Sequence, residues 1–362
     1  MNKIFKKVDL GIFLSSFLLV LIGLVSIFSS SIFSGDFSNF YKQIFFFLVG
    51  FSFLIFLSRM DWNFLKSDSK IISILFFIFL ILLLGLFLFA PLTRGIRGWY
   101  RVGGFSFSPI EFIKILVIIL LAKYFSSHHR TIYRTKDILK SLIYIILPSA
   151  AVFFQPDLGS IFVLLSIWTA MILISGIKIK HFAVLVFCGL ILFGFAWSFL
   201  LKDYQKERLV SFLHPQIEPK GISWNLVQSQ IAIGNGGFLG QGFGKGSQTQ
   251  YGFLPERQTD FIYSAIAEEF GLVGVSFLII CYAFLIWRII KISVSVKDES
   301  NNFIKLYSFG LITLFFSQAL VNIGMSLGLF PIIGLPLPFV SYSGSCLISC
   351  YIGLGVLMSM KL

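Results

Sequence analysis

Charged residues are scarce in this sequence, and so are the side chains that usually hold metals. Only 12% of the 362 residues are charged, 16 of them acidic, and there are four Cys and four His. So low a charge content excludes an ordinary soluble domain. The cysteines have neither metal-like spacing nor adjacent histidines, so we interpret them as packing residues.

Hydrophobic residues take the place of the missing charge. They make up 57% of the chain, which includes 45 Phe, and the mean hydropathy is +0.91. A bilayer core about 30 Å thick needs ~20 apolar residues per helix, and helices satisfy their own backbone there. The sequence therefore predicts an all-α, polytopic membrane protein, a single domain over 1–362, with about ten spans near 9–29, 41–58, 70–91, 107–125, 139–154, 158–177, 181–201, 261–288, 304–329 and 340–360.

Lys and Arg residues gather in alternate loops, which orients the predicted spans. Short cytoplasmic loops carry an excess of both residues, and this pattern places both termini in the cytoplasm. Residues 202–260 then form one large extracytoplasmic loop between the seventh and eighth spans. The net charge of +13 is explained by this topology and by anionic membrane lipid, so we expect no nucleic-acid partner.

Three arginines break the charge pattern, because Arg94, Arg97 and Arg101 fall in a loop that the topology places outside. The guanidinium group is a rigid fork of donors suited to phosphate. Neighbouring glycines such as Gly103 let a backbone approach a ligand closely. Two interpretations stay open: a site for a specific anionic ligand, or contact with lipid headgroups of the outer leaflet.

Three further charged residues, a closely spaced pair and a single aspartate, lie within or beside the predicted spans. Glu111 and Lys114 are three residues apart, hence neighbours on one helix face, and an interior ion pair is the least costly arrangement for both. We leave open whether that pair is structural or part of a site. Asp157 occupies a short outer turn, where it is either the N-cap of the next helix or a site residue.

The long loop contains a predicted short interfacial helix beginning at Trp224. Seven glycines follow between Gly234 and Gly246. No strand precedes them and no Walker lysine-serine pair follows, so nucleotide binding is rejected. We interpret this stretch as a tight re-entrant turn.

The run Gly252-Phe-Leu-Pro-Glu-Arg-Gln-Thr-Asp-Phe-Ile-Tyr263 brings an arginine and carboxylates to the entrance of the eighth span. Thr259 is the predicted N-cap and Asp260 the first-turn carboxylate, favoured there by the helix dipole. An ionised, partly desolvated Asp suits a general base, while Glu256 and Arg257 are candidate substrate-binding residues. The alternative is that Asp260 only caps the helix. Glu268 and Glu269, deeper in the span, need interior partners.

Motifs spread along the chain resemble those of the SEDS family (shape, elongation, division and sporulation). Pro-Glu-Arg257, and Ile-Ala-Ile-Gly after Gln-Ser, are more similar to the rod-shape branch than to the division branch. Gln258 stands where relatives commonly have His, which argues against an essential imidazole. The matching segments are Arg97-Gly-Trp-Tyr-Arg101, Ser108-Pro-Ile-Glu111-Phe-Ile-Lys114, Gln155-Pro-Asp157-Leu-Gly159, Trp224-Asn-Leu-Val-Gln-Ser-Gln-Ile-Ala-Ile233, Leu254-Pro-Glu-Arg-Gln-Thr-Asp-Phe-Ile262, Asn322-Ile-Gly-Met325 and Gly334-Leu-Pro-Leu-Pro-Phe-Val-Ser-Tyr-Ser-Gly-Ser345.

The resemblance implies a ten-helix glycosyltransferase of the bacterial cytoplasmic (inner) membrane that polymerises lipid II into peptidoglycan glycan strands for cell-wall elongation. It implies Asp260 as the base in an inverting transfer that expels undecaprenyl diphosphate. Arg94, Arg97 and Arg101 are then candidates to hold the diphosphate, and Glu111, Lys114 and Asp157 to shape the cavity.

The same resemblance implies partners. These are a class B penicillin-binding protein that cross-links the new strands, and other elongation-complex proteins. A divalent cation, Mg²⁺ or Mn²⁺, is a candidate cofactor, although no complete ligand set is visible. Ser341-Tyr-Ser-Gly-Ser-Cys346 has no histidine base nearby, so we predict helix packing rather than nucleophilic catalysis for it.

Two other functional classes stay open. A lipid II flippase also needs intramembrane charges but no base at the outer surface. A non-catalytic scaffold for the penicillin-binding protein needs none of the charged constellation.

Overall fold

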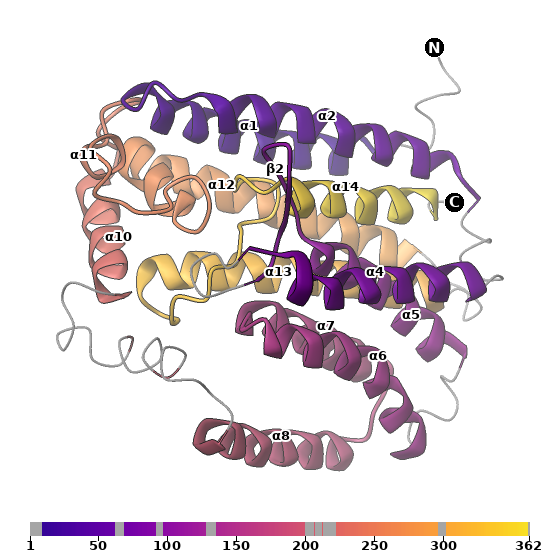
Figure 1. Ribbon diagram of the computed structural model, residues 1–362. Helices are drawn as coiled ribbons and strands as arrows, with labels where there is room; N and C mark the ends of the chain where they lie inside the picture. The colour runs from indigo at the N-terminus through magenta and orange to yellow at the C-terminus, as the bar shows by residue number, and fades with distance from the viewer. Residues whose placement is uncertain are drawn as a thin grey trace.

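The protein is a bundle of long helices (Figure 1). The computed structural model describes residues 9–61, 69–91, 97–127, 135–199, 206, 212, 222–295 and 302–360. The elements up to α8 are α1 (Leu10–Ile32), α2 (Ser38–Arg59), α4 (Ser69–Phe89), β1 (Tyr100–Val102), β2 (Phe105–Phe107), α5 (Pro109–Ser127), α6 (Thr135–Phe154), α7 (Leu158–Ile174) and α8 (Ile179–Phe199). The later elements are α10 (Ile222–Gly236), α11 (Ser247–Gln250), α12 (Ile262–Ser295), α13 (Asn302–Leu327) and α14 (Gly344–Ser359).

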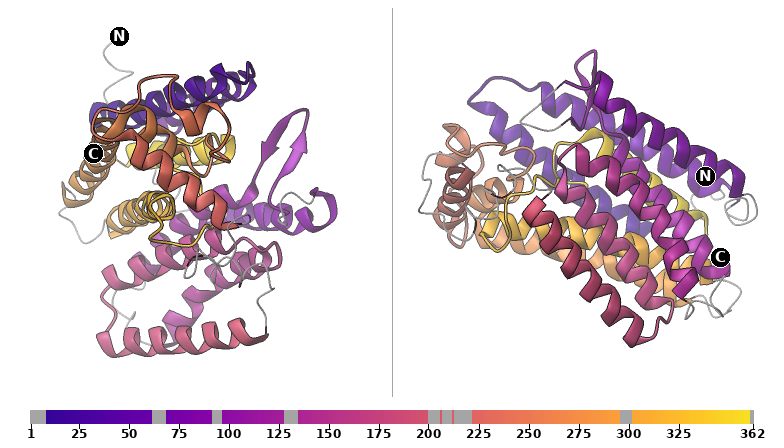
Figure 2. Two further views of the ribbon diagram at one scale, coloured as in Figure 1. Left: turned by 90° about the vertical axis from the view of Figure 1, so that its left-hand side faces the viewer. Right: turned by 60° about the horizontal axis from the view of Figure 1, so that its bottom comes forward.

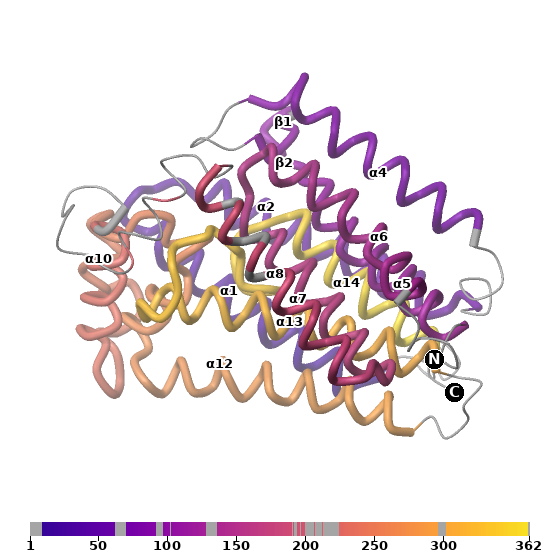
Figure 3. The backbone as a smooth tube through the Cα atoms, turned by 90° about the horizontal axis from the view of Figure 1, so that it is seen from below, coloured from indigo at the N-terminus to yellow at the C-terminus, as the bar shows by residue number. Residues whose placement is uncertain are grey.

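Each segment predicted to span the membrane overlaps one of these helices, and the predicted helix at Trp224 lies within α10. Among the described residues, six helices are long and apolar enough to cross a membrane. Further helices, such as α7 and α14, are apolar but shorter. The chain is therefore a multi-pass membrane protein. The helix α1 begins, and α14 ends, at the same end of the bundle (Figure 3).

Helices α1 and α12 are tied together by polar contacts near both of their ends. At one end Asp9 caps α1 and accepts a bidentate ion pair from Arg288, with 2.6 Å between Nη2 and Oδ2. At the other end the Ser29 hydroxyl donates to Glu269 over 2.6 Å. At ~1.5 Å of rise per residue the ties are about 30 Å apart along α12, which matches the thickness of a hydrocarbon core.

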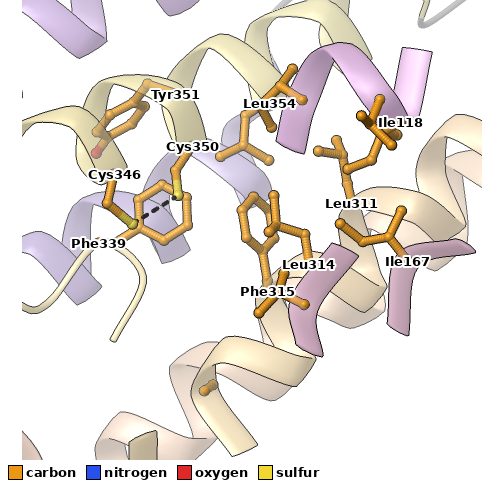
Figure 4. Close-up of a cluster of buried hydrophobic side chains, with 14 of the residues drawn as sticks. Ile118, Ile167, Leu311, Leu314, Phe315, Phe339, Cys346, Cys350, Tyr351 and Leu354 are labelled. Atoms are coloured by element: carbon orange, nitrogen blue, oxygen red, sulfur yellow. Dashed lines mark hydrogen bonds between the residues drawn. The ribbon is translucent and has the colours of Figure 1, made fainter. Parts of the chain in front are cut away.

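One aromatic cluster of the core lies between α13 and α14. Figure 4 shows Phe315, Phe339 and Tyr351 in this cluster, with ring centroids 5.3 Å and 5.4 Å apart in successive pairs. Gly344 allows α14 to approach α2, since a Cβ there would lie 2.5 Å from the Phe46 ring. This agrees with the packing predicted for the small residues at the start of α14.

Helix α12 is broken at Gly271, where φ is 62° and ψ is −160°. Residues 237–242, which we call the glycine strap, fill the break. The amides of Gln241 and Gly242 donate to the carbonyls of Glu268 and Glu269 over 2.9 Å and 3.0 Å, and the amide of Leu272 donates back to the strap. Backbone groups on both sides of the break are thus paired with the glycine strap.

The strap can lie this close only because glycine lacks a side chain. A Cβ on Gly240 would lie 2.2 Å from the Glu269 carbonyl oxygen, and one on Gly271 would lie 2.3 Å from the Gly240 nitrogen. The glycine-rich stretch was predicted as a tight turn. Its partner in the structure is another segment of backbone.

A two-stranded antiparallel sheet was missed by the all-α prediction. Strands β1 and β2 pair Tyr100 with Phe107 and Arg101 with Ser106. Gly103 and Gly104 connect them with φ of 56° and 80°, the conformation of a tight hairpin turn. Figure 2 shows the hairpin projecting beside the bundle, where Phe105 contacts Phe45 and Phe46 of α2.

Candidate functional site

The turn that carries Asp260 lies at the end of the bundle where α10 and α11 are found (Figure 1). The amides of Thr259 and Phe261 both donate to the Glu256 carbonyl, over 3.0 Å and 3.1 Å. Glu256 itself has a φ of 50°, a region that costs a non-glycine residue ~1–3 kcal/mol and recurs at functional sites. We call residues 252–261 the acidic turn.

The predicted capping of α12 is wrong. The helix begins at Ile262, so Thr259 is not its N-cap and Asp260 is not in its first turn. The Thr259 hydroxyl donates instead to the Glu256 carboxylate over 3.0 Å. The first hydrogen bond of the α-helical type, from residue i to residue i−4, is donated by the Ala265 amide to the Phe261 carbonyl. The hydrogen bonds from Thr259 and Phe261 to the Glu256 carbonyl thus move the start of α12 two residues later than predicted. Asp260 lies just before the helix and is half-buried.

Gln258 joins the acidic turn to α1 and α2. Its side-chain nitrogen donates to the hydroxyls of Ser30 and Ser31 over 2.9 Å and 3.2 Å, and its oxygen accepts from Asn39 over 2.7 Å. All of these contacts use an amide's ability to donate and accept at once. Gln258, which stands where relatives commonly have His, is therefore a structural link between the acidic turn and the helices α1 and α2.

A polar cavity of about 410 Å³ opens beside the acidic turn. Arg257 lines it, half-buried, with no hydrogen bond or ion pair to any residue that the structure describes. Because the guanidinium is half-buried, loss of hydration lowers its pKa. The other lining residues are Ser34, Asp36, Asn39, Gly252, Leu254, Pro255, Glu256, Gln258 and Thr259.

The two carboxylates deeper in α12 have the interior partners that the sequence required. Glu268 is fully buried and accepts hydrogen bonds from the amides of Gln248 and Thr249, over 2.7 Å and 2.9 Å, and from the Thr249 hydroxyl over 2.7 Å. Glu269 accepts a hydrogen bond from the Ser29 hydroxyl and, over 2.9 Å, one from the side-chain amide of Gln250. Together they fasten α11 and α1 to the helix that follows Asp260.

The predicted ion pair between Glu111 and Lys114 is confirmed. The Lys114 nitrogen lies 2.7 Å from Glu111 Oε1, and the lysine side chain is fully buried. Asp157 caps α7, because its carboxylate accepts from both the amide and the hydroxyl of Ser160, over 3.0 Å and 2.6 Å. The capping interpretation of Asp157 therefore holds.

The predicted cluster of outer arginines is only partly within the described residues. Arg94 lies outside them. Arg97 donates to the Phe87 carbonyl over 2.6 Å and is exposed. Arg101 is exposed on β1.

No group of three or more His, Cys, Asp or Glu side chains suited to a metal comes together in the part of the chain that the structure describes. The donors present there do not make a protein-held cation site, and we derive no chemical step through a metal.

The sequence motifs contained two residues whose role the sequence did not reveal. Asn322 on α13 and Ser341 before α14 both donate hydrogen bonds to backbone carbonyls of the acidic turn, over 2.9 Å and 2.6 Å. A signal was available for Asn322. It lies one helical turn from Gln318 in a predicted membrane span, where buried amides are costly and usually functional.

Comparison with known proteins gives consistent matches. The family model for FtsW, RodA and SpoVE, described as cell cycle protein, matches residues 10–362. Stage V sporulation protein E of Bacillus subtilis is 33% identical, covering 98% of this chain and 96% of that protein. Peptidoglycan glycosyltransferase MrdB of Escherichia coli is 38% identical, covering 79% of this chain and 76% of that protein. The probable peptidoglycan glycosyltransferase FtsW of Haemophilus influenzae is 34% identical, covering 97% and 89%.

Solved structures agree with this assignment of the fold. A chain from a structure described as the coordination of polymerization and crosslinking by a peptidoglycan synthase complex aligns with a TM-score of 0.82 at 27% identity, over 98% of this chain and 97% of that one. The rod shape determining protein RodA of Thermus thermophilus aligns with a TM-score of 0.70 at 25% identity, over 98% and 96%.

Proposed function

The chain belongs to the FtsW, RodA and SpoVE family of cell cycle proteins, and from this premise we propose that it is a peptidoglycan glycosyltransferase that polymerises lipid II. Relatives that bear the name of this activity match most of the chain. One observation carries the proposal for the site: Asp260 directly follows Thr259, which lines a polar cavity together with Arg257, a half-buried arginine that has no ion pair with any residue the structure describes.

The proposed reaction is an inverting transfer. The Asp260 carboxylate accepts the proton of the acceptor sugar's 4-hydroxyl, and that oxygen attacks the anomeric carbon of the donor sugar. The bond from this carbon to undecaprenyl diphosphate breaks as the new β-1,4 bond forms, so the diphosphate leaves with the bonding electron pair. General-base catalysis of this kind contributes roughly 10²–10⁴ in rate.

Arg257 is the cation best placed to bind an anionic group of the substrate. A guanidinium that is partly desolvated and unpaired gains more from an anion than an exposed one does. Arg97 and Arg101, which are exposed, are assigned to the approach of the diphosphate at the membrane surface. A divalent cation enters the proposal only as a counter-ion of that diphosphate.

The interior polar residues have supporting roles in this proposal. The Glu111–Lys114 pair and Asp157 help to shape the protein interior and do not contact the reacting atoms. Glu256, whose carboxylate is held by the Thr259 hydroxyl, forms the wall of the cavity towards Asp260.

The proposed topology has ten transmembrane helices in the bacterial inner membrane and both termini in the cytoplasm. Residues 202–260 then form the outer loop, and the acidic turn faces the compartment in which the cell wall is built. The proposed partner is a class B penicillin-binding protein, in keeping with the synthase complex to which a structural relative belongs. Other elongation-complex proteins complete the assembly.

The decisive experiment measures glycan strands made from purified lipid II by the solubilised protein with its co-expressed partner. Asp260→Asn is compared with wild type after both are shown to be folded and partner-bound. We expect polymer from wild type and at least 100-fold less from the variant, by the size of base catalysis. Equal polymer from both would reject Asp260 as the base. Transfer of lipid II across liposomes without polymer would instead identify a flippase, and partner recruitment alone a scaffold.

A further inference from the structure

Three successive backbone carbonyls in the acidic turn are each held by the C-terminal part of the chain. Neither α12 nor the turn itself supplies these donors. The contacts are Tyr342 N to Gln258 O at 2.8 Å, Ser341 Oγ to Thr259 O at 2.6 Å, and Asn322 Nδ2 to Asp260 O at 2.9 Å. The peptide on either side of the Asp260 Cα is thereby restrained from outside its own helix.

Two of these donors also hold the segment between α13 and α14. Asn322 Nδ2 donates a second hydrogen bond, 2.7 Å long, to the Leu335 carbonyl. The Ser341 hydroxyl accepts from the Leu337 amide over 2.9 Å. Both side chains are buried, with 0% and 3% of their surface exposed. Each therefore joins the acidic turn to residues 335–337, and we call the two side chains the carbonyl brace.

Helix α13 carries a second buried amide close to Asn322. Gln318 lies one turn before Asn322, is also fully buried, and has no partner for either side-chain polar atom among the described residues. A buried amide without partners costs free energy. Both amides are buried on α13, but of the two only Asn322 makes a hydrogen bond to the acidic turn among the described residues.

We propose that Asn322 and Ser341 are positioning residues that fix the Asp260 carboxylate for proton abstraction. This inference rests on the proposed function of Asp260. The brace holds the carbonyl of Asp260 itself and that of the residue before it, so its loss lets the whole peptide shift. A displacement of about 1 Å at a reacting group can cost on the order of 100-fold in rate.

The test compares two leucine substitutions on one face of α13, Asn322→Leu and Gln318→Leu, in the full chain bound to its partner. We expect Asn322→Leu to lower kcat by roughly 10- to 100-fold and to leave both KM and the Kd for fluorescent lipid II within about twofold of wild type. Gln318→Leu is expected to keep kcat within about twofold, because it removes no contact to the turn. A parallel loss of lipid II binding and turnover in Asn322→Leu would mark a merely structural role and overturn the proposal.

Substitutions of Ser341 provide a second and smaller change in case Asn322→Leu does not fold. Ser341→Ala should lower kcat, and Ser341→Thr, which keeps the hydroxyl, should restore most of it. Neither Asn322→Leu nor Ser341→Ala should reduce the residual activity of Asp260→Asn any further, because the brace acts through that carboxylate. A further loss in that background would contradict the proposal.

The two proposals fail in distinguishable ways. If Asp260→Asn polymerises lipid II as wild type does, the assignment of the base fails, and the brace fails with it. If Asp260→Asn is inactive while Ser341→Ala and Asn322→Leu turn over as Gln318→Leu does, only the brace is rejected.

Discussion

The acidic turn and the arginine-bearing hairpin were both expected to be functional, yet the structure builds them in opposite ways. Hydrogen bonds join the acidic turn to α1, α2, α13 and the segment before α14. The hairpin is held by ring contacts of Phe105 with Phe45 and Phe46 in tilted and edge-on geometry and by the hydrogen bond from the Tyr100 hydroxyl to the Leu82 carbonyl, and Arg101 is exposed.

This difference separates two tasks that a polymerase of this kind must perform. Proton abstraction requires a carboxylate held within a fraction of an ångström. Attraction of a diphosphate at a membrane surface depends on charge, which acts over a Debye length of roughly 10 Å and tolerates imprecise geometry. We therefore expect substitutions at the acidic turn to affect stability and turnover, and those on the hairpin to affect mainly substrate capture.

The largest difference in stability is expected between Glu268→Gln and Arg101→Ala. Glu268 accepts several hydrogen bonds from residues 247–249, and an amide would turn one of its acceptors into a donor that faces other donors. We expect a loss of about 3 kcal/mol, since hydrogen bonds to charged groups are worth roughly 1.5–3 kcal/mol each. Arg101→Ala should stay within about 0.5 kcal/mol.

Thermal unfolding of the detergent-solubilised proteins would measure this difference. A loss of stability in Arg101→Ala as large as that in Glu268→Gln would show that the hairpin is as firmly integrated as α12, the helix that directly follows the acidic turn. The proposed division of tasks would then be wrong.

The next effect concerns substrate binding by Arg257 and Arg101. We expect Arg257→Met to raise KM for lipid II about tenfold, which corresponds to ~1.4 kcal/mol, because its guanidinium is half-buried and has no ion pair within the described part of the chain. Its stability should be unchanged or higher, since a desolvated charge is removed. Arg101→Met should raise KM less, and only at low salt.

Initial rates at low and high ionic strength, with Arg257→Lys as the control that keeps charge but loses the fork, would measure these effects. The opposite order, with the larger and salt-resistant effect at Arg101, would identify the hairpin as the specific anion site. It would leave Arg257 as a structural residue.

Much of the helical layout was predictable from the sequence, because long apolar runs have few alternatives in a membrane. The ion pair between Glu111 and Lys114 was predictable for the same reason, since two charges three residues apart in an apolar helix can satisfy each other. The β1–β2 hairpin was missed, although Gly103-Gly104 between Tyr-Arg-Val and Phe-Ser-Phe is a recognisable turn signal.

The contacts around Asp260 were not predictable, because they join residues far apart in the chain. Nothing local indicates that Asn322 reaches the Asp260 carbonyl, or that Gln258 reaches Ser30. The capping prediction failed because Thr-Asp before an apolar run is a genuine N-terminal pattern. Tertiary hydrogen bonds and the turn bonds to the Glu256 carbonyl moved the start of the helix.

The smallest difference between two variants is expected for Gly334→Ala and Gly103→Ala, which are also the most closely matched pair of variants. Both glycines have positive φ, 73° and 56°, so an alanine at either position costs about 1 kcal/mol in stability. Their surroundings differ. A Cβ on Gly334 would lie 3.4 Å from Asp260 Oδ2, whereas one on Gly103 would meet nothing within 4 Å.

Equal losses of stability with unequal losses of turnover are therefore expected. Gly334→Ala should reduce kcat several-fold because it crowds the carboxylate, and Gly103→Ala should leave kcat unchanged because its strain stays in the hairpin. Unfolding midpoints and single-turnover rates on the same preparations would separate the two effects. If turnover falls equally in both variants, strain in the hairpin affects the Asp260 carboxylate as much as strain beside it does, and the acidic turn is not the independently braced unit that its hydrogen bonds describe.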